Sequence, residues 1–291
     1  MRPTLESLRL HQWSKNLLLA VPAVVGQAAG NPGVVRNLVI AYLAFSVTAS
    51  GNYILNDVID VAADRRHPLK RQRPVASGRM PVARAAIVAP LLMACGIGTA
   101  FVFVNQPFAM MLLGYVVLGL AYSKFFKRLL ILDVLVLALL YTLRLLAGGA
   151  AVDVAVSSWL LVFSMFFFVS LAFAKRIAEI DVLAPTELGN EGARAYAFTD
   201  RGAFATMGPS AGIVSILVMA LYVSSDAIRA HYHRPDVLWM LCPLLLYWLL
   251  RLWIFALRGE LHHDPVLFAL RDRVSYAVAA AVLTVLYVAA G

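Results

Sequence analysis

Residues 34–64, VVRNLVIAYLAFSVTASGNYILNDVIDVAAD, join a long apolar run to a series of acidic residues. The run at 34–55 is long enough to cross a bilayer as a helix, which needs about 20 apolar residues. Similar runs recur along the chain, which is 62% hydrophobic and 14% charged and has a mean hydropathy of +0.79. Soluble domains carry roughly 25% charged residues. The sequence therefore predicts an all-α, polytopic membrane helical bundle.

Nine apolar stretches are expected to span the membrane, and the first of them is short enough to be tilted or partly interfacial. They lie at about 17–31, 34–55, 82–104, 107–123, 129–150, 156–175, 203–224, 236–256 and 273–290. No linker interrupts them, so residues 1–291 are expected to form a single integral membrane domain. The polar, basic N-terminus does not resemble a cleavable signal peptide.

The basic residues are distributed asymmetrically between the two sides of these spans. Of the 25 Lys and Arg residues, 21 fall at the N-terminus or around the loops that follow spans two, four, six and eight. The positive-inside rule places these segments in the cytoplasm, as in a multi-pass protein of an inner (cytoplasmic) membrane. The net charge of +9 thus belongs to one membrane face. It favours anionic headgroups or an anionic substrate as partners, and nucleic acid is a poor explanation for it.

Nearly all the acidic residues share these loops, which predicts one polar site at the cytoplasmic face. Asp57, Asp60 and Asp64 close the second span and fall within one arc of a helix end. Such carboxylates repel one another unless a divalent cation lies among them, and this density of oxygen ligands suits Mg²⁺. Lys70 and Arg73 follow and could bind phosphates directly. A solvated loop would explain the basic residues but not the acidic spacing.

The pattern N-D-x-x-D-x-x-x-D, formed by Asn56, Asp57, Asp60 and Asp64, resembles the first aspartate-rich motif of the UbiA prenyltransferase superfamily. Asn52, one turn earlier, also fits, and the resemblance covers essentially the whole chain. It implies a nine-helix membrane enzyme with a cytoplasm-facing active site. It also implies Mg²⁺ bound to a diphosphate, with the three aspartates as metal ligands and catalytic residues. Most members transfer an isoprenoid from a polyprenyl diphosphate to an aromatic or other acceptor.

Two features resemble instead the decaprenyl-phosphate phosphoribosyltransferase branch of that superfamily. The motif continues as His67-Pro68-x-Lys70-x-x-Arg73-Pro74, where the aromatic branch more often has an Arg-Thr pair. After span six, where the aromatic branch has a second D-x-x-x-D, this chain has Lys175 and Arg176 in LAFAKRIAEIDVL (171–183). The resemblance implies transfer of 5-phosphoribose from phosphoribosyl pyrophosphate to a polyprenyl, decaprenyl-type phosphate. Prenyl transfer stays the alternative, and a transporter is disfavoured because the charges gather at one face.

The same resemblance implies a set of substrate-binding residues. They are Lys15, Asn56, Lys70, Arg73, Tyr122, Lys127, Tyr141, Arg144, Lys175 and Arg176. Structural alternatives remain open for several of them. Lys15 could extend to headgroups, Asn56 could cap a helix, and Arg144 could join an intramembrane polar network with Tyr141. The sequence also leaves open whether the protein is a homo-oligomer.

Six further residues have open roles at this stage. His67 could make a local turn contact, and Glu179 could pair with Lys175 one turn earlier on a helix. The last cytoplasmic loop offers candidate lid residues, namely His262, His263, Asp264 and Asp272.

Overall fold

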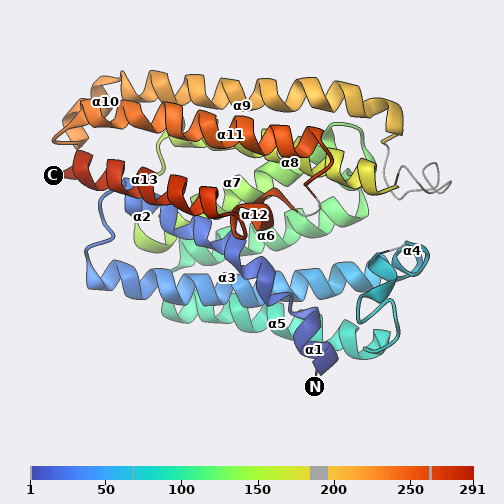
Figure 1. Ribbon diagram of the computed structural model, residues 1–291. Helices are drawn as coiled ribbons and strands as arrows, with labels where there is room; N and C mark the ends of the chain where they lie inside the picture. Colours follow the sequence, from blue (N-terminus) through green and yellow to red (C-terminus); the bar gives the residue numbers. More distant parts are fainter. Residues whose placement is uncertain (1, 68, 184–195, 262–263) are drawn as a thin grey trace. The chain divides into compact units, whose positions relative to one another are not determined.

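The computed structural model describes residues 2–67, 69–183, 196–261 and 264–291, and all regular structure in these residues is helical (Figure 1). The first half of the chain contains α1 (Arg2–Ser7), the 3₁₀ helix η1 (Leu10–Ala20), α2 (Val21–Val25), α3 (Pro32–Ile59), α4 (Val61–Arg66), η2 (Lys70–Gln72), α5 (Val82–Phe103), α6 (Gln106–Lys124) and η3 (Phe126–Arg128). The second half contains α7 (Leu132–Val152), α8 (Ser158–Leu183), η5 (Phe198–Asp200), α9 (Arg201–Val223), α10 (Asp226–His231), η6 (Pro235–Met240), α11 (Leu241–Leu257), α12 (Pro265–Ala269) and α13 (Arg273–Ala290).

Eight segments of the described chain are long and apolar enough to cross a membrane, and they match eight of the nine expected spans. The all-α membrane bundle is therefore confirmed. The stretch expected at 17–31 forms no such helix, because it divides into η1 and the five-residue α2. Pro22 lacks a backbone N–H and lies in the first turn of α2. Gln27 then adopts a left-handed φ of 56°, which ends the helix.

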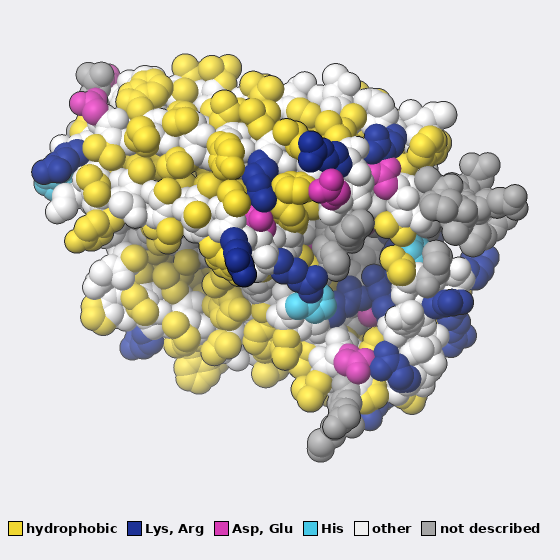
Figure 2. All heavy atoms as spheres, in the orientation of Figure 1, with side chains coloured by type: hydrophobic (Ala, Val, Ile, Leu, Met, Phe, Trp, Pro, Cys, Tyr) yellow, Lys and Arg dark blue, Asp and Glu magenta, His cyan; other side chains and the backbone are white. Residues whose placement is uncertain are grey.

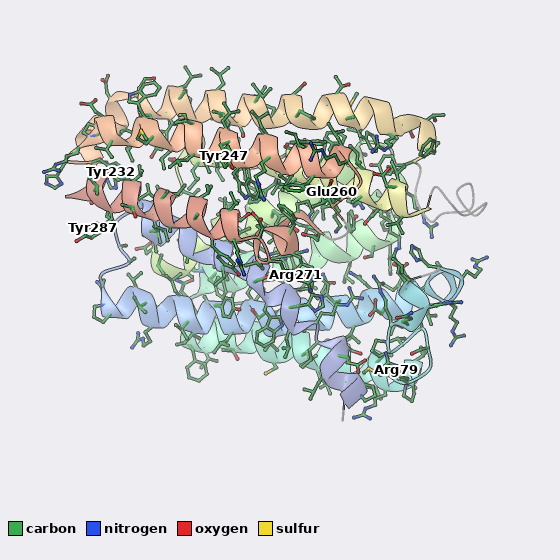
Figure 3. All side chains as sticks on the ribbon, in the orientation of Figure 1. Arg79, Tyr232, Tyr247, Glu260, Arg271 and Tyr287 are labelled. Atoms are coloured by element: carbon green, nitrogen blue, oxygen red, sulfur yellow. The ribbon has the colours of Figure 1, made fainter. Side chains whose placement is uncertain are left out.

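The outer surface of these helices is apolar, as a lipid-facing surface must be. Leu91 and Val102 of α5 are 63% and 73% exposed, and Tyr287 of α13 is 79% exposed. Figure 2 shows hydrophobic side chains spread over α9 and α11, and Figure 3 marks Tyr247 on α11 and Tyr287 on α13. Exposed apolar surface of this extent needs lipid or another apolar partner. The chain is a multi-pass integral membrane protein.

The chain divides into two compact units, the first comprising Met1–Leu129 and Leu143–Val156. In this unit α3 and α5 lie side by side (Figure 1). A Cβ atom added to Gly51 of α3 would lie 2.6 Å from the carbonyl oxygen of Ala89. One added to Gly96 of α5 would lie 2.1 Å from Oγ1 of Thr48. These glycines let the two helix backbones approach closely, as small residues commonly do in membranes.

The second unit comprises Leu130–Thr142 and Ser157–Gly291, and in it α8 packs along α9. The Trp253 ring of α11 occupies the space above Gly208, where an added Cβ would lie 2.1 Å from it. Trp253 also donates a hydrogen bond from Nε1 to Ser170 Oγ at 2.9 Å. Each unit thus has its own packed interior, and the single domain expected from the sequence stays a prediction.

Candidate active site

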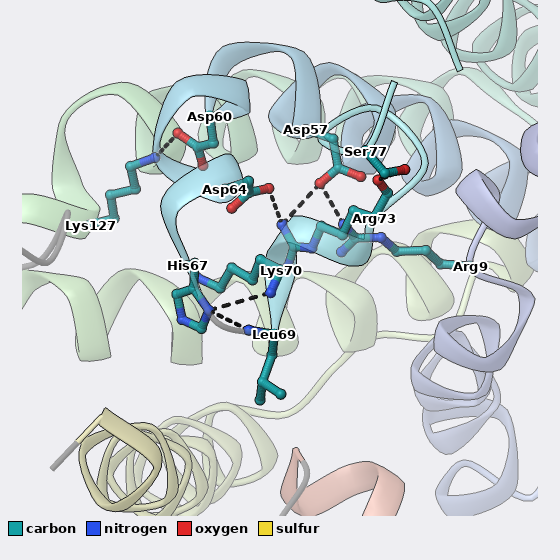
Figure 4. Close-up of polar contacts among 10 residues, drawn as sticks. All are labelled: Arg9, Asp57, Asp60, Asp64, His67, Leu69, Lys70, Arg73, Ser77 and Lys127. Carbon is teal, nitrogen blue, oxygen red and sulfur yellow. Dashed lines mark hydrogen bonds and ion pairs between the residues drawn. The ribbon is translucent and has the colours of Figure 1, made fainter. Parts of the chain in front are cut away.

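The acidic motif lies where α3 gives way to α4. Asp60 joins the two helices with φ −93° and ψ 5°, so that the three aspartates come from two helix segments (Figure 4). Asp57 and Asp64 are buried, with 2% and 3% of their surfaces exposed, whereas Asp60 is half-buried. Carboxylates this deeply buried require compensation by nearby cations or hydrogen-bond donors.

Three cations supply that compensation. The Nη1 atom of Arg73 lies 3.0 Å from Oδ1 of Asp57 and 2.7 Å from Oδ2 of Asp64. Lys127 of η3 pairs with Asp60. Arg73 and Lys127 both contact carboxylates here, and their expected role in substrate binding stays a prediction. We call these residues, together with Arg9, the acid cluster.

Arg9 is the member of the acid cluster that sequence reasoning missed. Its Nη2 atom lies 2.5 Å from Oδ1 of Asp57, and its guanidinium lies 5.5 Å from the centre of the Tyr53 ring. The sequence showed Arg9 only as one of the cytoplasmic basic residues. It precedes Asp57 by 48 residues, so no local spacing could have revealed the pair.

Burial dominates the electrostatics of Asp64. It raises the pKa of the Asp64 carboxyl above its ordinary value, while Arg73 and Lys70 act in the opposite direction. The charged form is thus held at some cost in free energy. A further cation close to Asp64 would favour that charged form.

The residues around the motif have the chemistry to hold Mg²⁺, although no preassembled metal site exists in the described part of the chain. No three Asp, Glu, His or Cys side chains gather closely enough there to hold a metal ion. However, three buried oxygens at and just before the acidic motif lack hydrogen-bond partners among the described residues, namely Asn52 Oδ1, Asn56 Oδ1 and Asp57 Oδ2. Mg²⁺ prefers oxygen ligands of this kind. The donor set therefore fits the ion, and the assignment of Asp57, Asp60 and Asp64 as its ligands stays a prediction.

Asn52 is held against α6 by a close contact. A Cβ atom added to Gly119 would lie 2.3 Å from Nδ2 of Asn52. Only glycine leaves room for the amide at this point. The helix pair α3 and α6 thereby fixes an oxygen one turn before Asn56.

The residues after the acidic motif make a tight turn. Nδ1 of His67 accepts hydrogen bonds from the backbone N–H groups of Leu69 and Lys70, at 3.2 and 3.3 Å (Figure 4). This confirms a local turn contact for His67. Lys70 is half-buried at the start of η2, and Tyr122 is half-buried near the end of α6.

Two expected substrate-binding cations are buried within the first unit. Arg144 is 4% exposed and donates from Nε to Asn16 Oδ1 at 3.0 Å and from Nη2 to Tyr115 Oη at 3.1 Å. Its guanidinium also lies over the rings of Phe45 and Tyr115. Arg144 therefore belongs to an intramembrane polar network. Lys15 is 6% exposed in η1, so it is covered by protein rather than extended towards headgroups.

A second group of charges, the α8 cluster, lies in the second unit. The Nε atom of Arg176 lies 2.6 Å from Oδ2 of Asp133, and Arg176 also pairs with Glu179. The Nζ atom of Lys175 lies 3.3 Å from Oδ2 of Asp264. Expected on a loop, these residues lie in the last turns of α8, because 171–183 contains no glycine or proline to end the helix.

Asp264 is the second residue whose role the sequence did not reveal. The Tyr141 hydroxyl lies 3.5 Å from both of its carboxylate oxygens, and the Tyr141 ring stacks on Phe168. Asp264 also accepts from the backbone N–H of Val266 and so caps α12. The other lid candidates His262 and His263 lie outside the described residues.

Asp272 has a structural role at the start of α13. It accepts hydrogen bonds from the backbone N–H and hydroxyl of Ser275, both at 2.8 Å, and pairs with Arg251 at 2.6 Å. Burial acts to raise the pKa of Asp272, but the hydrogen bonds from Arg251 and Ser275 hold it below its ordinary value. Asp272 is therefore a helix cap.

The chain has relatives across its whole length. It is 38% identical over 277 residues to the uncharacterised protein y4nM of Sinorhizobium fredii. The matched region covers 95% of this chain but only 54% of y4nM. It is 33% identical over 272 residues to nodulation protein NoeC of Azorhizobium caulinodans, covering 92% of this chain and 86% of NoeC. Decaprenyl-phosphate phosphoribosyltransferase of Corynebacterium glutamicum is 37% identical over 179 residues, covering 60% of this chain and 54% of that protein.

The fold has solved counterparts. The structure of a UbiA homologue from Archaeoglobus fulgidus bound to GPP and Mg²⁺ matches with a TM-score of 0.72 at 17% identity, covering 99% of both chains. The same homologue bound to DMAPP and Mg²⁺ matches with a TM-score of 0.73 at 18% identity, covering 98% of both chains. At these identities the likeness shows the shared fold. Residues 18–276 match the sequence model of the UbiA prenyltransferase family, and the chain belongs to this family of membrane transferases.

Proposed function

We propose that this transferase moves 5-phosphoribose from phosphoribosyl pyrophosphate to a polyprenyl phosphate. The observation that carries the proposal is the pair of cations, Lys175 and Arg176, in the last turns of α8. A prenyl diphosphate has a single anionic group, whereas phosphoribosyl pyrophosphate also carries a separate 5-phosphate. The extra cations suit that second anion. The 37% identity to a phosphoribosyltransferase over 179 residues supports the same choice.

In this proposal the acid cluster binds the pyrophosphate of the donor, on the cytoplasmic side of an inner membrane. Mg²⁺, when bound, stabilises the negative charge that develops on the leaving pyrophosphate. Asp57, Asp60 and Asp64 would hold the ion, and the oxygens of Asn52, Asn56 and Asp57 that lack hydrogen-bond partners could complete its ligands. Arg73 and Lys127, which pair with the aspartates when no substrate is bound, would then contact phosphate oxygens instead. Arg73 can do so bidentately.

The transfer itself needs no general base from the protein. An oxygen of the polyprenyl phosphate attacks C1 of the ribose, and the bond from C1 to the pyrophosphate oxygen breaks. The pyrophosphate leaves with the bonding electron pair. Because the attacking phosphate oxygen is already an anion, no proton moves in this step. The protein's work is to position the two substrates, stabilise the leaving group and exclude water.

The α8 cluster and the buried cations are assigned to the remaining phosphates. Lys175 is 25% exposed at its side chain and can contact the 5-phosphate directly. Arg176 is 1% exposed and held by Asp133 and Glu179, so a phosphate on Arg176 would have to replace Glu179. Lys15 and Arg144 are assigned to the lipid phosphate, since a buried cation attracts an anion strongly where the dielectric constant is low.

The test supplies purified protein in lipid nanodiscs with one of two substrate pairs. We expect turnover with phosphoribosyl pyrophosphate and polyprenyl phosphate, and none with polyprenyl diphosphate and aromatic acids. Turnover with the second pair alone would refute the proposal and support prenyl transfer.

Two variants test the assigned roles. Asp60→Asn should abolish turnover in the presence of Mg²⁺, and retained activity would remove Asp60 from the metal site. Lys175→Ala should raise KM for the sugar phosphate with little change in kcat, because it removes binding that substrate and transition state share. An unchanged KM would assign Lys175 a structural role with Asp264.

A further inference from the structure

A surface cavity lies on the segment between α4 and α5, outside the acid cluster. Its volume is about 660 Å³, within the range of about 300–1,000 Å³ that is usual for small-molecule sites. It is lined by Arg65, Arg71, Gln72, Ala76, Ser77 and Arg79. Figure 2 shows Lys and Arg side chains gathered around α4 and the segment that follows, and Figure 3 marks Arg79.

Two of the three arginines that line the cavity, Arg65 and Arg71, have no ion-pair partner among the described residues. Its lining contains three arginines and no carboxylate. Arg79 is balanced by Glu6, whose Oε2 lies 2.6 Å from Nη1 of Arg79. Arg65 donates only its Nε, to the carbonyl oxygen of Ala76 at 3.2 Å. The Arg71 guanidinium has no hydrogen-bond or ion-pair partner within the described residues.

The positive-inside rule explains why this segment is basic, but it does not explain why three guanidinium groups line one hollow. Like charges repel one another, so gathering them around one hollow is unfavourable unless an anion balances them. Arg66 follows Arg65 on α4 and is likewise exposed, but it does not line the cavity. Ser77 and Gln72 add neutral polar groups to the lining. Guanidinium groups bind phosphate oxyanions through strong, charge-assisted hydrogen bonds.

We propose that this cavity binds a phosphate-bearing anion at a site separate from the acid cluster. The anion is either a dissolved phosphate or the headgroup of an anionic lipid at the cytoplasmic surface. The proposal is independent of which group the enzyme transfers.

An anion bound in this cavity would affect the acid cluster through the backbone of Gln72 and Arg73. Ser77 Oγ donates to the carbonyl oxygen of Arg73 at 2.8 Å, and Arg79 Nη2 donates to that of Gln72 at 2.8 Å. The residues that line the cavity thus hold the backbone at Arg73, and the Arg73 side chain contacts both Asp57 and Asp64. An anion across the arginines would relieve their mutual repulsion and stabilise this segment.

The test compares the double variant Arg65→Gln/Arg71→Gln with Arg66→Gln and the unchanged protein. Arg66→Gln is the control, since it removes an exposed positive charge from the same segment but none from the cavity. Inorganic phosphate is titrated against the thermal unfolding midpoint in detergent. We expect the double variant to need about tenfold more phosphate for the same rise, since two exposed charge contacts are lost. Arg66→Gln should match the unchanged protein.

A second arm uses nanodiscs of phosphatidylcholine with and without phosphatidylglycerol at roughly one lipid in five. A rise in midpoint caused by phosphatidylglycerol, and lost in the double variant alone, would identify a lipid headgroup as the anion. A phosphate response lost in the double variant alone would identify a dissolved phosphate. Equal responses of all three proteins to both probes would overturn the proposal, because any anion bound elsewhere acts on all three alike.

Discussion

Arg73→Gln is the most informative single change in the acid cluster. One nitrogen of Arg73, Nη1, lies within hydrogen-bond distance of two buried carboxylates, at 3.0 Å from Asp57 and 2.7 Å from Asp64. Glutamine keeps a polar side chain but removes the charge. Asp57 retains Arg9 as a partner, whereas Asp64 loses the guanidinium that contacts it.

The expected cost follows from burial and distance. At an effective dielectric constant of about 20, two unit charges near 3 Å attract by roughly 5 kcal/mol. Removing one partner of a buried pair costs about 3–5 kcal/mol, because the other charge stays buried. The Arg73 side chain is 31% exposed, so solvent screening reduces this, and we expect about 2 kcal/mol. For a chain of this size that lowers the unfolding midpoint by roughly 4–8 °C.

The assay is thermal unfolding of purified protein in detergent, with Mg²⁺ removed by a chelator and then restored. Arg73→Gln should unfold at a lower temperature than the unchanged protein, and Arg66→Gln, which removes an exposed charge, should not. Restored Mg²⁺ should recover part of the loss, since a divalent cation replaces the missing positive charge beside Asp57 and Asp64. If Arg73→Gln unfolds at the same temperature as Arg66→Gln, the argument that Arg73 holds the acid cluster together is wrong.

Two further predictions concern the contact between Gly119 and Asn52 and the burial of Asp64. Gly119→Ala should destabilise the protein by about 1–3 kcal/mol, because the new Cβ would lie 2.3 Å from Asn52 Nδ2. The control is Gly114→Ala on the same helix, where an added Cβ has nothing within 4 Å, and it should be neutral or slightly stabilising. Equal unfolding midpoints for the two variants would contradict the close contact. Asp64→Asn should raise the thermal unfolding midpoint at neutral pH. Because the pKa of Asp64 is raised in the folded state, protonated Asp64 favours folding at low pH, and this contribution is lost as pH rises through that pKa. The gain should shrink as pH falls through the same range in a series of buffered unfolding scans, and a gain independent of pH would show that burial of the charge is not its cause.

The membrane-spanning helices were predictable because hydropathy is a local property of the sequence. Pro32–Ile59 and Val82–Phe103 each agree with the expected spans to within a few residues. The stretch expected at 17–31 is helical only as far as Val25, as η1 followed by α2, and the turn at Gln27 keeps it too short to count among the eight long spans. The expected span at 156–175 ended too early, because α8 continues to Leu183. Lys175 and Arg176 ended the apolar run, but charge alone does not end a helix.

The ion pairs were not predictable, because they join residues far apart in sequence. Arg9 and Asp57 are 48 residues apart, and the partners Lys175 and Asp264 come from α8 and the start of α12. Spacing rules along one helix cannot detect such pairs. The positive-inside rule acts on whole loops, so the sequence predicts only that these residues share one face of the membrane. It could not say which carboxylate meets which cation.

The acidic motif and the basic segment after it are more closely connected than their sequence suggests. The sequence divides them into a metal-binding half, Asn56 to Asp64, and a phosphate-binding half, His67 to Pro74. In the structure Arg73 from the second half neutralises Asp57 and Asp64 from the first. The presence of Arg73 is therefore explained by the burial of these acids, even before any phosphate is considered. It follows that a loss of activity in an Arg73 variant does not by itself identify a phosphate contact. The loss is attributed to a phosphate contact only where KM for the donor rises by more than the lower fraction of folded protein accounts for.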